Sequence, residues 1–276
     1  MKLIILYENN LKVFIIEYLL SLKKFINVDI LMFSNNMLTL NIIKNAKCVI
    51  FIQRIPISLC NYLDTTKFFI LNIEQFTNKK IFDFIKQHQN IIDYSYENVL
   101  YTKTHLNIKN HLWFPYGYNP DEIYNYEKTQ NICLIGRSPR RNMVINKFND
   151  NKCPITQLNR IFGMERDKQL FTFKILINVH NDSNYVIHEV MRCDRCVFNK
   201  MIVINENSLY NNSLLSKFMI FVDYNKIAET AINVINNYEY YYNKLFIEQD
   251  FDNFIKEYQI KLKTIYDEQL KIIKTI

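Results

Sequence analysis

The chain has 276 residues, and the 49% of them that are hydrophobic are enough to bury one large core or two smaller ones. Its three glycines exclude a Walker loop and a GxGxxG dinucleotide fingerprint, and no apolar run reaches the roughly 18 residues of a membrane-spanning helix. The net charge of +7 is spread evenly, since residues 1–125 carry 13 Lys and Arg against 10 Asp and Glu and the rest carry 21 against 17. A nucleic-acid-binding protein more often concentrates its positive charge in a patch.

The first half of the chain alternates short apolar runs with amphipathic stretches. This alternation is typical of an α/β protein with a parallel sheet. Strands are predicted at about residues 2–7, 27–33, 47–53, 67–73, 91–94 and 111–114. Helices are predicted between them, including 11–25 and 78–89.

The second half repeats this pattern after a polar segment, 117–130, that contains Gly117 and Pro120. Its strands are predicted at 131–135, 154–158, 174–180, 201–205 and 218–222. Its helices are predicted at 139–149, 165–172, 184–198 and, as one long helix, from about 225. We therefore expect an N-terminal domain over 1–120, a second domain over 130–245 and a helical tail over 246–276.

Seven of the eight arginines lie between residues 137 and 195. Three of them, Arg137, Arg140 and Arg141, surround a turn in which a strand ends at Gly136 and Pro139 suits the first turn of a helix. The free N–H groups and the dipole of a helix N-terminus favour an anion, and arginine binds phosphate with two parallel hydrogen bonds. The turn is a candidate cradle for a diphosphate, and a solvated basic turn is the alternative.

The segment 174–206 places further polar residues near strand ends. One strand is expected to end at His180, a helix to carry His188, Glu189 and Arg192, and the next strand to end at Glu206. Glu206 could accept hydrogen bonds from ribose hydroxyls, while the other side chains meet the sugar or the phosphates. The alternative is a structural His180 and a simple ion pair between Glu189 and Arg192, three positions apart on a helix.

These segments resemble the C-terminal half of group 1-type GT-B glycosyltransferases, in particular the CgeB/YkvP-like branch and its members in large DNA viruses. The resemblance covers about 130–245 and is looser before that, where it rests on 73–75, 93–95 and 115–118. The sequence departs from the family at Asn205, where Ser or Thr is commoner in these enzymes. This departure makes the identity of the nucleotide-sugar donor harder to infer. The matching residues are Gly163–Asp167, Lys174–His180, Glu189–Arg192 and Asn205–Glu206.

The resemblance implies two Rossmann-like domains that face each other across a cleft, and transfer of a sugar from a nucleotide-sugar to a glycan, protein or lipid. It also implies that no metal or other cofactor is needed, because arginines would stabilise the leaving nucleoside diphosphate. Glu74, at the end of the apolar run 67–73, is the candidate base for the acceptor hydroxyl. Ordinary hydrogen bonding is the alternative role for Glu74. The donor-binding candidates are Arg137, Arg140, Arg141, His180, Glu189, Arg192 and Glu206.

Two further motifs are interpreted as structural. Cys193 and Cys196 form a single CxxC inside a predicted helix, which favours buried thiols over zinc, and the DxD of Asp250 and Asp252 lies in the charged tail. The N-terminal apolar stretch is too short for a signal peptide, so we expect reduced thiols and a cytoplasmic protein, in the host cytoplasm if the chain is viral. All six cysteines are included in that expectation: Cys48, Cys60, Cys133, Cys153, Cys193 and Cys196.

The expected partners are a nucleotide-sugar and a sugar or glycoconjugate acceptor. No nucleic acid is expected, a peripheral contact with an anionic membrane is an option, and the sequence does not indicate an oligomeric state. Two alternative functions remain open. One is a non-catalytic nucleotide- or sugar-binding module on the same fold, and the other, supported only by net charge, is a nucleic-acid-binding protein.

Overall fold

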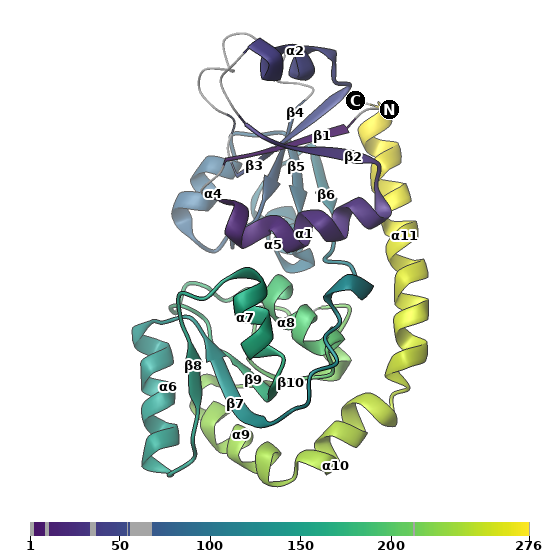
Figure 1. Ribbon diagram of the computed structural model, residues 1–276. Coiled ribbons are helices and arrows are strands. Elements are labelled where there is room, and N and C mark those ends of the chain that lie inside the picture. The colour runs from purple at the N-terminus through teal and green to yellow at the C-terminus, as the bar shows by residue number, and fades with distance from the viewer. Residues whose placement is uncertain are drawn as a thin grey trace. The chain divides into compact units, whose positions relative to one another are not determined.

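The computed structural model describes residues 3–8, 11–33, 37–53, 55, 68–211 and 213–275 (Figure 1). The chain forms two compact units. Unit 1 is the chain up to Gly117 together with the chain from Gln259 onward, and unit 2 is Tyr118–Tyr258. Each unit holds one parallel β-sheet, so the predicted α/β class with two parallel-sheet units is confirmed. Cys60 and the first residue of the strand predicted at 67–73 lie outside the described residues.

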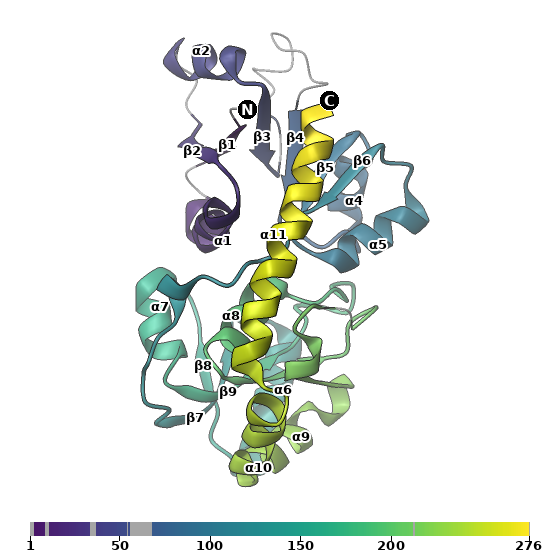
Figure 2. The ribbon, with the colours of Figure 1, turned by 90° about the vertical axis from the view of Figure 1, so that its right-hand side faces the viewer.

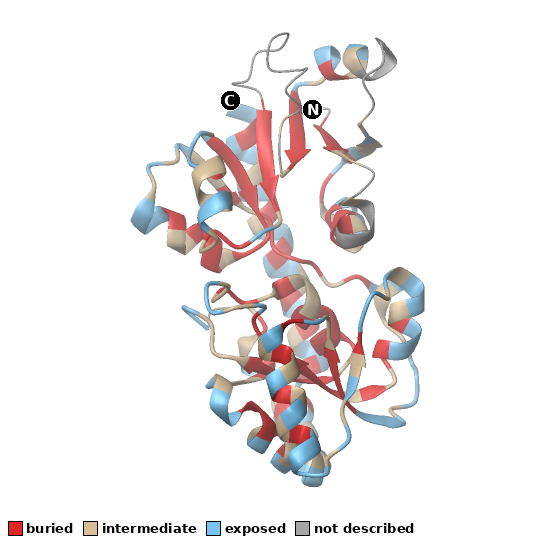
Figure 3. Ribbon diagram, turned by 90° about the vertical axis from the view of Figure 1, so that its left-hand side faces the viewer, coloured by how far each residue is buried: buried red, intermediate tan, exposed pale blue. Residues whose placement is uncertain are grey.

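Unit 1 contains six parallel strands in the order β2-β1-β3-β4-β5-β6. The runs CVIFI of β3 and FFILN of β4 are buried at every position, as expected for central strands that are covered on both faces. Figure 3 shows the strands mainly in red, the colour of buried residues. The strands are β1 (Leu3–Tyr7), β2 (Val28–Met32), β3 (Cys48–Ile52), β4 (Phe68–Asn72), β5 (Asn90–Asp93) and β6 (Asn110–Trp113).

The helices of unit 1 include two that were not predicted, α2 and α5. Helix α5 lacks an apolar stripe because its buried residues include Glu97, Asn98 and Thr102, and such a polar face gives no helical pattern in the sequence. The predicted helix 78–89 is shorter, beginning after Asn78, whose side chain accepts a hydrogen bond from Lys80 N. The helices are α1 (Lys12–Phe25), α2 (Met37–Asn45), α4 (Lys79–Ile85) and α5 (Tyr96–His105).

Unit 2 contains five parallel strands in the order β11-β10-β9-β7-β8. The predicted strands are all present, although β9 ends two residues before His180. The strands are β7 (Gln130–Ile135), β8 (Thr156–Leu158), β9 (Phe173–Asn178), β10 (Ile202–Glu206) and β11 (Met219–Val222). The helices that precede or separate them are η3 (Pro120–Glu122), α6 (Pro139–Asp150), α7 (Gly163–Leu170), α8 (Val190–Phe198) and η4 (Ser216–Phe218).

Two predicted helices of the second half are wrong in extent. The helix predicted at 184–198 begins only at Val190, so His188 and Glu189 precede it. The long helix predicted from about 225 is interrupted at Asn237, whose backbone is not helical, and at Asp250, whose φ is +48°. Asn and Asp adopt such conformations more readily than most residues. The resulting elements are η5 (Tyr224–Lys226), α9 (Ile227–Asn236), α10 (Tyr238–Tyr242), the π-helical η6 (Asn243–Ile247) and α11 (Phe251–Thr275).

Helix α11, yellow in Figure 2, contributes residues to both units. In unit 2 the Phe251 and Phe254 rings contact Phe218, with ring centroids 4.9 and 4.7 Å away. In unit 1 the hydroxyl of Tyr266 donates to the carbonyl of Pro115. Of the helices in the described ranges, none has a long enough apolar stretch to cross a bilayer. The DxD carboxylates are exposed, and Asp252 forms an ion pair with Lys200 at 2.9 Å.

Candidate functional site

Most of the predicted donor-site residues meet at the carboxyl edge of the sheet in unit 2. The edge is formed by the ends of β7, β9, β10 and β11, which are parallel. Ligands of open α/β sheets bind outside this edge. Hydrogen bonds join six of the seven predicted residues into two groups. Arg140, Glu206 and the backbone of His180 form one group, and Arg141, Glu189 and Arg192 form the other. Together these six residues are called the arginine network.

The turn after β7 has the predicted form. Gly136 has a φ of +80°, Ser138 caps α6 by accepting a hydrogen bond from Arg141 N at 3.3 Å, and Pro139 is the first helical residue. A Cβ on Gly136 would lie 2.7 Å from Nη1 of Arg141. Glycine is therefore favoured here both by the backbone conformation and by the guanidinium beside it.

Arg140 and Glu206 form the first ion pair of the network. Nη2 of Arg140 donates to Oε1 of Glu206, and Oε2 of the same carboxylate accepts from the backbone N of His180 at 3.0 Å. The guanidinium carbon lies 4.2 Å from the ring centroid of Tyr224. Among the described residues, the buried Nε of Arg140 has no hydrogen-bond partner, so this side chain keeps an unused donor.

Arg141 lies inside the unit, with only 5% of the residue exposed. Its Nε donates to the carbonyl of Val179 at 3.0 Å and its Nη2 to Glu189 at 3.3 Å. Burial and the neighbouring Arg192 lower its pKa to about 10, against the opposing effect of Glu189 and Glu206. Arg141 thus joins the turn after β7 to the end of β9.

Arg192 pairs with Glu189, as the structural alternative anticipated. Its Nη1 lies 2.5 Å from Oε2 of Glu189 and 2.9 Å from Oδ1 of Asn178. Glu189 occupies the N-cap position of α8, which places its carboxylate between Arg141 and Arg192. The carboxylate is bonded on both sides and one fifth of its side chain is exposed.

His180 follows β9 and is 2% exposed. Its Nε2 lies 3.2 Å from the carbonyl oxygen of Asn207. A carbonyl can only accept, so this contact assigns the proton of the neutral ring to Nε2 and leaves Nδ1 as an acceptor. Within the part of the chain that the structure describes, Nδ1 is buried and has no partner.

The charge of this edge suits an anion. Arg137 is exposed on the same turn, so the seven predicted residues hold four guanidinium groups against two carboxylates, an excess of two positive charges. Asp223, directly after β11, adds a carboxylate that accepts from Nδ2 of Asn207 at 2.7 Å. The N-terminus of α6 adds its dipole and free N–H groups. A diphosphate carries the complementary charge.

Two other arginines of the segment 137–195, Arg166 and Arg195, have structural roles. Arg195 binds both oxygens of Asp167, at 3.2 and 2.8 Å, and one oxygen of Glu122 at 3.0 Å. Arg166 donates to the same Asp167 at 2.8 Å. Because Asp167 and Arg195 are buried, Asp167, the last residue of the motif at 163–167, is part of the interior of unit 2.

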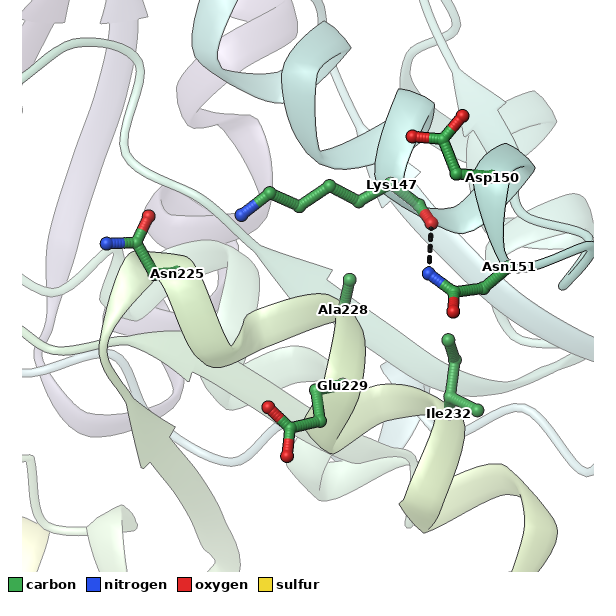
Figure 4. Close-up of a pocket in the computed structure, with 7 residues that line it drawn as sticks. All are labelled: Lys147, Asp150, Asn151, Asn225, Ala228, Glu229 and Ile232. Carbon is green, nitrogen blue, oxygen red and sulfur yellow. Dashed lines mark hydrogen bonds between the residues drawn. The ribbon is translucent and has the colours of Figure 1, made fainter.

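A hollow of about 280 Å³ lies between α6 and α9 (Figure 4). Its polar lining includes Lys147, Asp150 and Glu229, together with the amides of Asn151 and Asn225. Two carboxylates against one ammonium disfavour an anion there. Among the described residues no group of three His, Cys, Asp or Glu side chains could hold a metal ion.

Glu74, the predicted base, is exposed in unit 1 on the turn after β4. Its carbonyl accepts from the side-chain amides of Asn72 at 2.6 Å and Asn98 at 2.9 Å, and both amides also donate to Asp93. Asp93 is fully buried, and burial raises its pKa against the opposing effect of His111. This cluster of Asn72, Asn98 and Asp93 was not predicted from the sequence, although both β4 and β5 end an apolar run on a polar residue.

No family model matches the chain. It is 33% identical over 186 residues to uncharacterized protein L140 of Acanthamoeba polyphaga mimivirus, covering 62% of this chain and 60% of that protein. It is 30% identical over 219 residues to uncharacterized protein R358 of the same virus, covering 75% of this chain and 73% of that protein. The chain spans only 20% of protein L138 and 32% of protein L137.

Solved structures with a similar fold are glycosyltransferases. A DNA-modifying β-glucosyltransferase, solved with and without uridine diphosphoglucose, gives a TM-score of 0.59 at 13% identity over 99% of both chains. TarM gives 0.56 at 11% identity over 82% of this chain and 54% of its own. The lipopolysaccharide outer core galactosyltransferase WaaB gives 0.50 at 10% identity over 98% of this chain and 99% of its own.

The fold is therefore that of the GT-B glycosyltransferases, as the resemblance implied. Within that class the chain belongs to the family of mimivirus protein R358, which confirms the expected likeness to viral members. The CgeB/YkvP-like branch stays a prediction.

Proposed function

We propose that the protein is a glycosyltransferase that binds its nucleotide-sugar donor at the carboxyl edge of the unit 2 sheet. The observation that carries the proposal is the arginine network at the N-terminus of α6. Together with Arg137 it has two more guanidinium groups than carboxylates, and the buried Nε of Arg140 has no partner among the described residues. Two structural neighbours support a nucleotide ligand of this kind. β-Glucosyltransferase was solved with its substrate uridine diphosphoglucose, and a TarM variant was solved in complex with UDP.

Each of the seven predicted side chains has a proposed role. Arg137 and Arg140 bind the diphosphate, since one is exposed and the other keeps a free donor. Arg141 and Arg192 act through their charge and by holding Glu189. Glu206 accepts hydrogen bonds from ribose hydroxyls with the lone pairs that Arg140 and His180 leave free, and His180 Nδ1 accepts one from a hydroxyl of the donor.

The proposed reaction breaks the bond between the anomeric carbon and the phosphate oxygen, and the electron pair leaves on the nucleoside diphosphate. A new bond joins the anomeric carbon to the acceptor oxygen, whose proton passes to Glu74 and then to water. Guanidinium groups stabilise the negative charge that develops on the leaving group. We propose that this requires no metal, so activity should survive EDTA.

The acceptor is proposed to be a hydroxyl of a glycan, a protein or a lipid. Acceptor screening should include DNA, because one structural neighbour is described as a DNA-modifying enzyme. Incorporation of radiolabelled sugar into each acceptor class distinguishes them. Binding of sugar nucleotides with neither transfer nor donor hydrolysis would indicate the non-catalytic alternative.

A thermal-shift panel of nucleoside diphosphates and sugar nucleotides tests the donor site, because a ligand of the native state raises the apparent stability. The Arg137→Ala/Arg140→Ala double variant should weaken binding at least tenfold, given roughly 1.5–3 kcal/mol for each charged hydrogen bond. Lys152→Ala is the control for the loss of a positive charge, because Lys152 is exposed just after the C-terminal end of α6, the end opposite the proposed site. Unchanged affinity in the double variant would overturn the assignment of the site.

A further inference from the structure

Tyr224 makes two separate contacts with Arg140. It follows β11 as the first residue of η5, at the same sheet edge as Glu206. Its ring centroid lies 4.2 Å from the guanidinium carbon of Arg140, and its hydroxyl donates to the carbonyl oxygen of Arg140 at 2.9 Å. One aromatic residue thus touches both the side chain and the backbone of the same arginine.

The guanidinium of Arg140 is constrained from two directions. Glu206 binds Nη2, and the Tyr224 ring lies against the guanidinium. At this distance the negative face of the ring attracts the cation. Without the ring, the ion pair alone would allow the long side chain to rotate about its bonds. The buried Nε, which has no partner among the described residues, would then lose its fixed direction.

The Tyr224 hydroxyl remains a donor over the physiological range. Burial raises the pKa of this phenol, Arg140 lowers it and Glu206 raises it, with a net shift upward from its ordinary value of 10. A neutral phenol keeps both the hydrogen bond to the Arg140 carbonyl and the unperturbed ring.

We propose that Tyr224 is a positioning residue that holds the Arg140 guanidinium in place for the diphosphate of the donor. This inference rests on the proposed function and concerns the same site. The sequence does not single this residue out, because the chain contains 19 tyrosines and Tyr224 lies 84 positions from Arg140.

The test measures binding of UDP and of uridine to the full chain by isothermal titration, with GDP and guanosine in parallel. Tyr224→Leu removes ring and hydroxyl, Tyr224→Met is a second variant of similar length, and Tyr224→Phe keeps the ring. Tyr238→Leu is the matched control, because Tyr238 is also partly buried in unit 2 and carries Lys174 Nζ at 5.0 Å from its ring centroid. Thermal melts show which variants fold.

Tyr224→Leu and Tyr224→Met should weaken UDP binding roughly 3- to 30-fold, the range expected for a cation–π contact, and leave uridine binding unchanged. Tyr224→Phe should stay within about twofold of the unmodified protein, because the ring carries most of the contact. Tyr238→Leu should bind UDP normally. Because Tyr224 acts through Arg140, adding Tyr224→Leu to Arg140→Ala should cause no further loss.

An equal loss for UDP and uridine, or full additivity with Arg140→Ala, would overturn the positioning role. Normal UDP binding by a folded Tyr224→Leu or Tyr224→Met variant would also overturn it. A different result, in which the unmodified protein binds no nucleoside diphosphate, would overturn the proposed function itself and the role of Tyr224 with it.

Discussion

Gly136 and Gly163 both have left-handed backbones in unit 2, with φ of +80° and +57°, but their surroundings differ. A Cβ on Gly136 would meet Arg141 Nη1 at 2.7 Å, whereas a Cβ on Gly163 would have no neighbour within 4 Å. The guanidinium could move aside, but only by breaking its bonds to Val179 and Glu189. The two glycines therefore form a natural comparison.

Gly163→Ala should cost about 1–2 kcal/mol in the free energy of unfolding, through backbone strain alone. Gly136→Ala should cost about 1 kcal/mol more, through a lost hydrogen bond, and should also weaken UDP binding because it displaces Arg141. Urea denaturation and UDP titration of both variants measure these effects. Equal effects of the two substitutions on UDP affinity would contradict the coupling between Gly136 and Arg141.

The buried carboxyl of Asp93 should make stability depend on pH in a defined direction. Its pKa is raised in the folded state by burial, so between the ordinary value of about 3.9 and the raised value the folded protein binds more protons than the unfolded one. The free energy of unfolding contributed by Asp93 must therefore fall as the pH rises through this window. Asp167 has a lowered pKa. Its contribution to the free energy of unfolding is therefore lost only as the pH falls below the ordinary pKa of an aspartate.

Asp93→Asn removes this titration. The free energy of unfolding of the unmodified protein minus that of the variant should fall as the pH rises above about 4. Asp194 also has a raised pKa, but its effect cancels in this difference because both proteins contain it. Urea denaturation at a series of pH values provides the measurement. If the free energy of unfolding of the unmodified protein minus that of the variant rises with pH, the pKa of Asp93 is lowered instead.

At the scale of elements, a buried ion network holds the segment after Gly117 to unit 2. Arg195 of α8 binds Asp167 of α7 and Glu122 of η3, and the side chain of Asn199 accepts from Tyr124 N at 2.7 Å. The ring of Tyr124 stacks on Phe171 with centroids 4.9 Å apart. The conformation of residues 119–124 therefore depends on α7 and α8.

Arg195→Ala should lower the free energy of unfolding by about 3–5 kcal/mol, because it leaves Asp167 as a buried carboxylate without its bidentate partner. Lys226→Ala is the control, since it breaks an exposed pair with Glu229 that is worth at most about 1 kcal/mol. Urea denaturation of both variants tests the contrast. Similar losses in the two would mean that the network contributes no more than a surface ion pair.

At the scale of the whole molecule, two places in unit 2 compete as the nucleotide site, namely the carboxyl edge of the sheet and the hollow between α6 and α9. The edge carries the excess positive charge, while the hollow carries more carboxylates than ammonium groups. Charge therefore favours the edge, even though the hollow has a defined volume.

Hydrogen–deuterium exchange with and without UDP should show protection of peptides covering 136–141, 178–192 and 206–207. Peptides at the far ends of α6 and α9 should be unchanged, because binding at the edge orders the strand–helix turns there. Glu229→Ala, in the hollow, should bind UDP normally. Protection centred on the hollow, or a large effect of Glu229→Ala, would place the site between α6 and α9.

The order of apolar runs in the sequence was enough to predict the α/β class, the strands of both sheets and the turn at Gly136 and Pro139. This succeeded because central strands of parallel sheets need continuous apolar segments, which are visible without the structure. Helix α5 was missed because its buried face is polar, and the helix at 190–198 was placed too early because the preceding loop is partly apolar. The local sequence pattern does not distinguish a helix with a polar buried face from a loop, or a partly apolar loop from the start of a helix.

The predicted strand ends also placed Arg140, His180 and Glu206 near one another, because the carboxyl ends of parallel strands share an edge. Which groups each of these side chains contacts depends on the folded chain. Arg141 is buried against Val179 and Glu189, 38 and 48 positions away, and Arg140 lies against Tyr224, 84 positions away. Such partners are brought together by strand order and helix packing, and the spacing of residues along the chain carries no information about them.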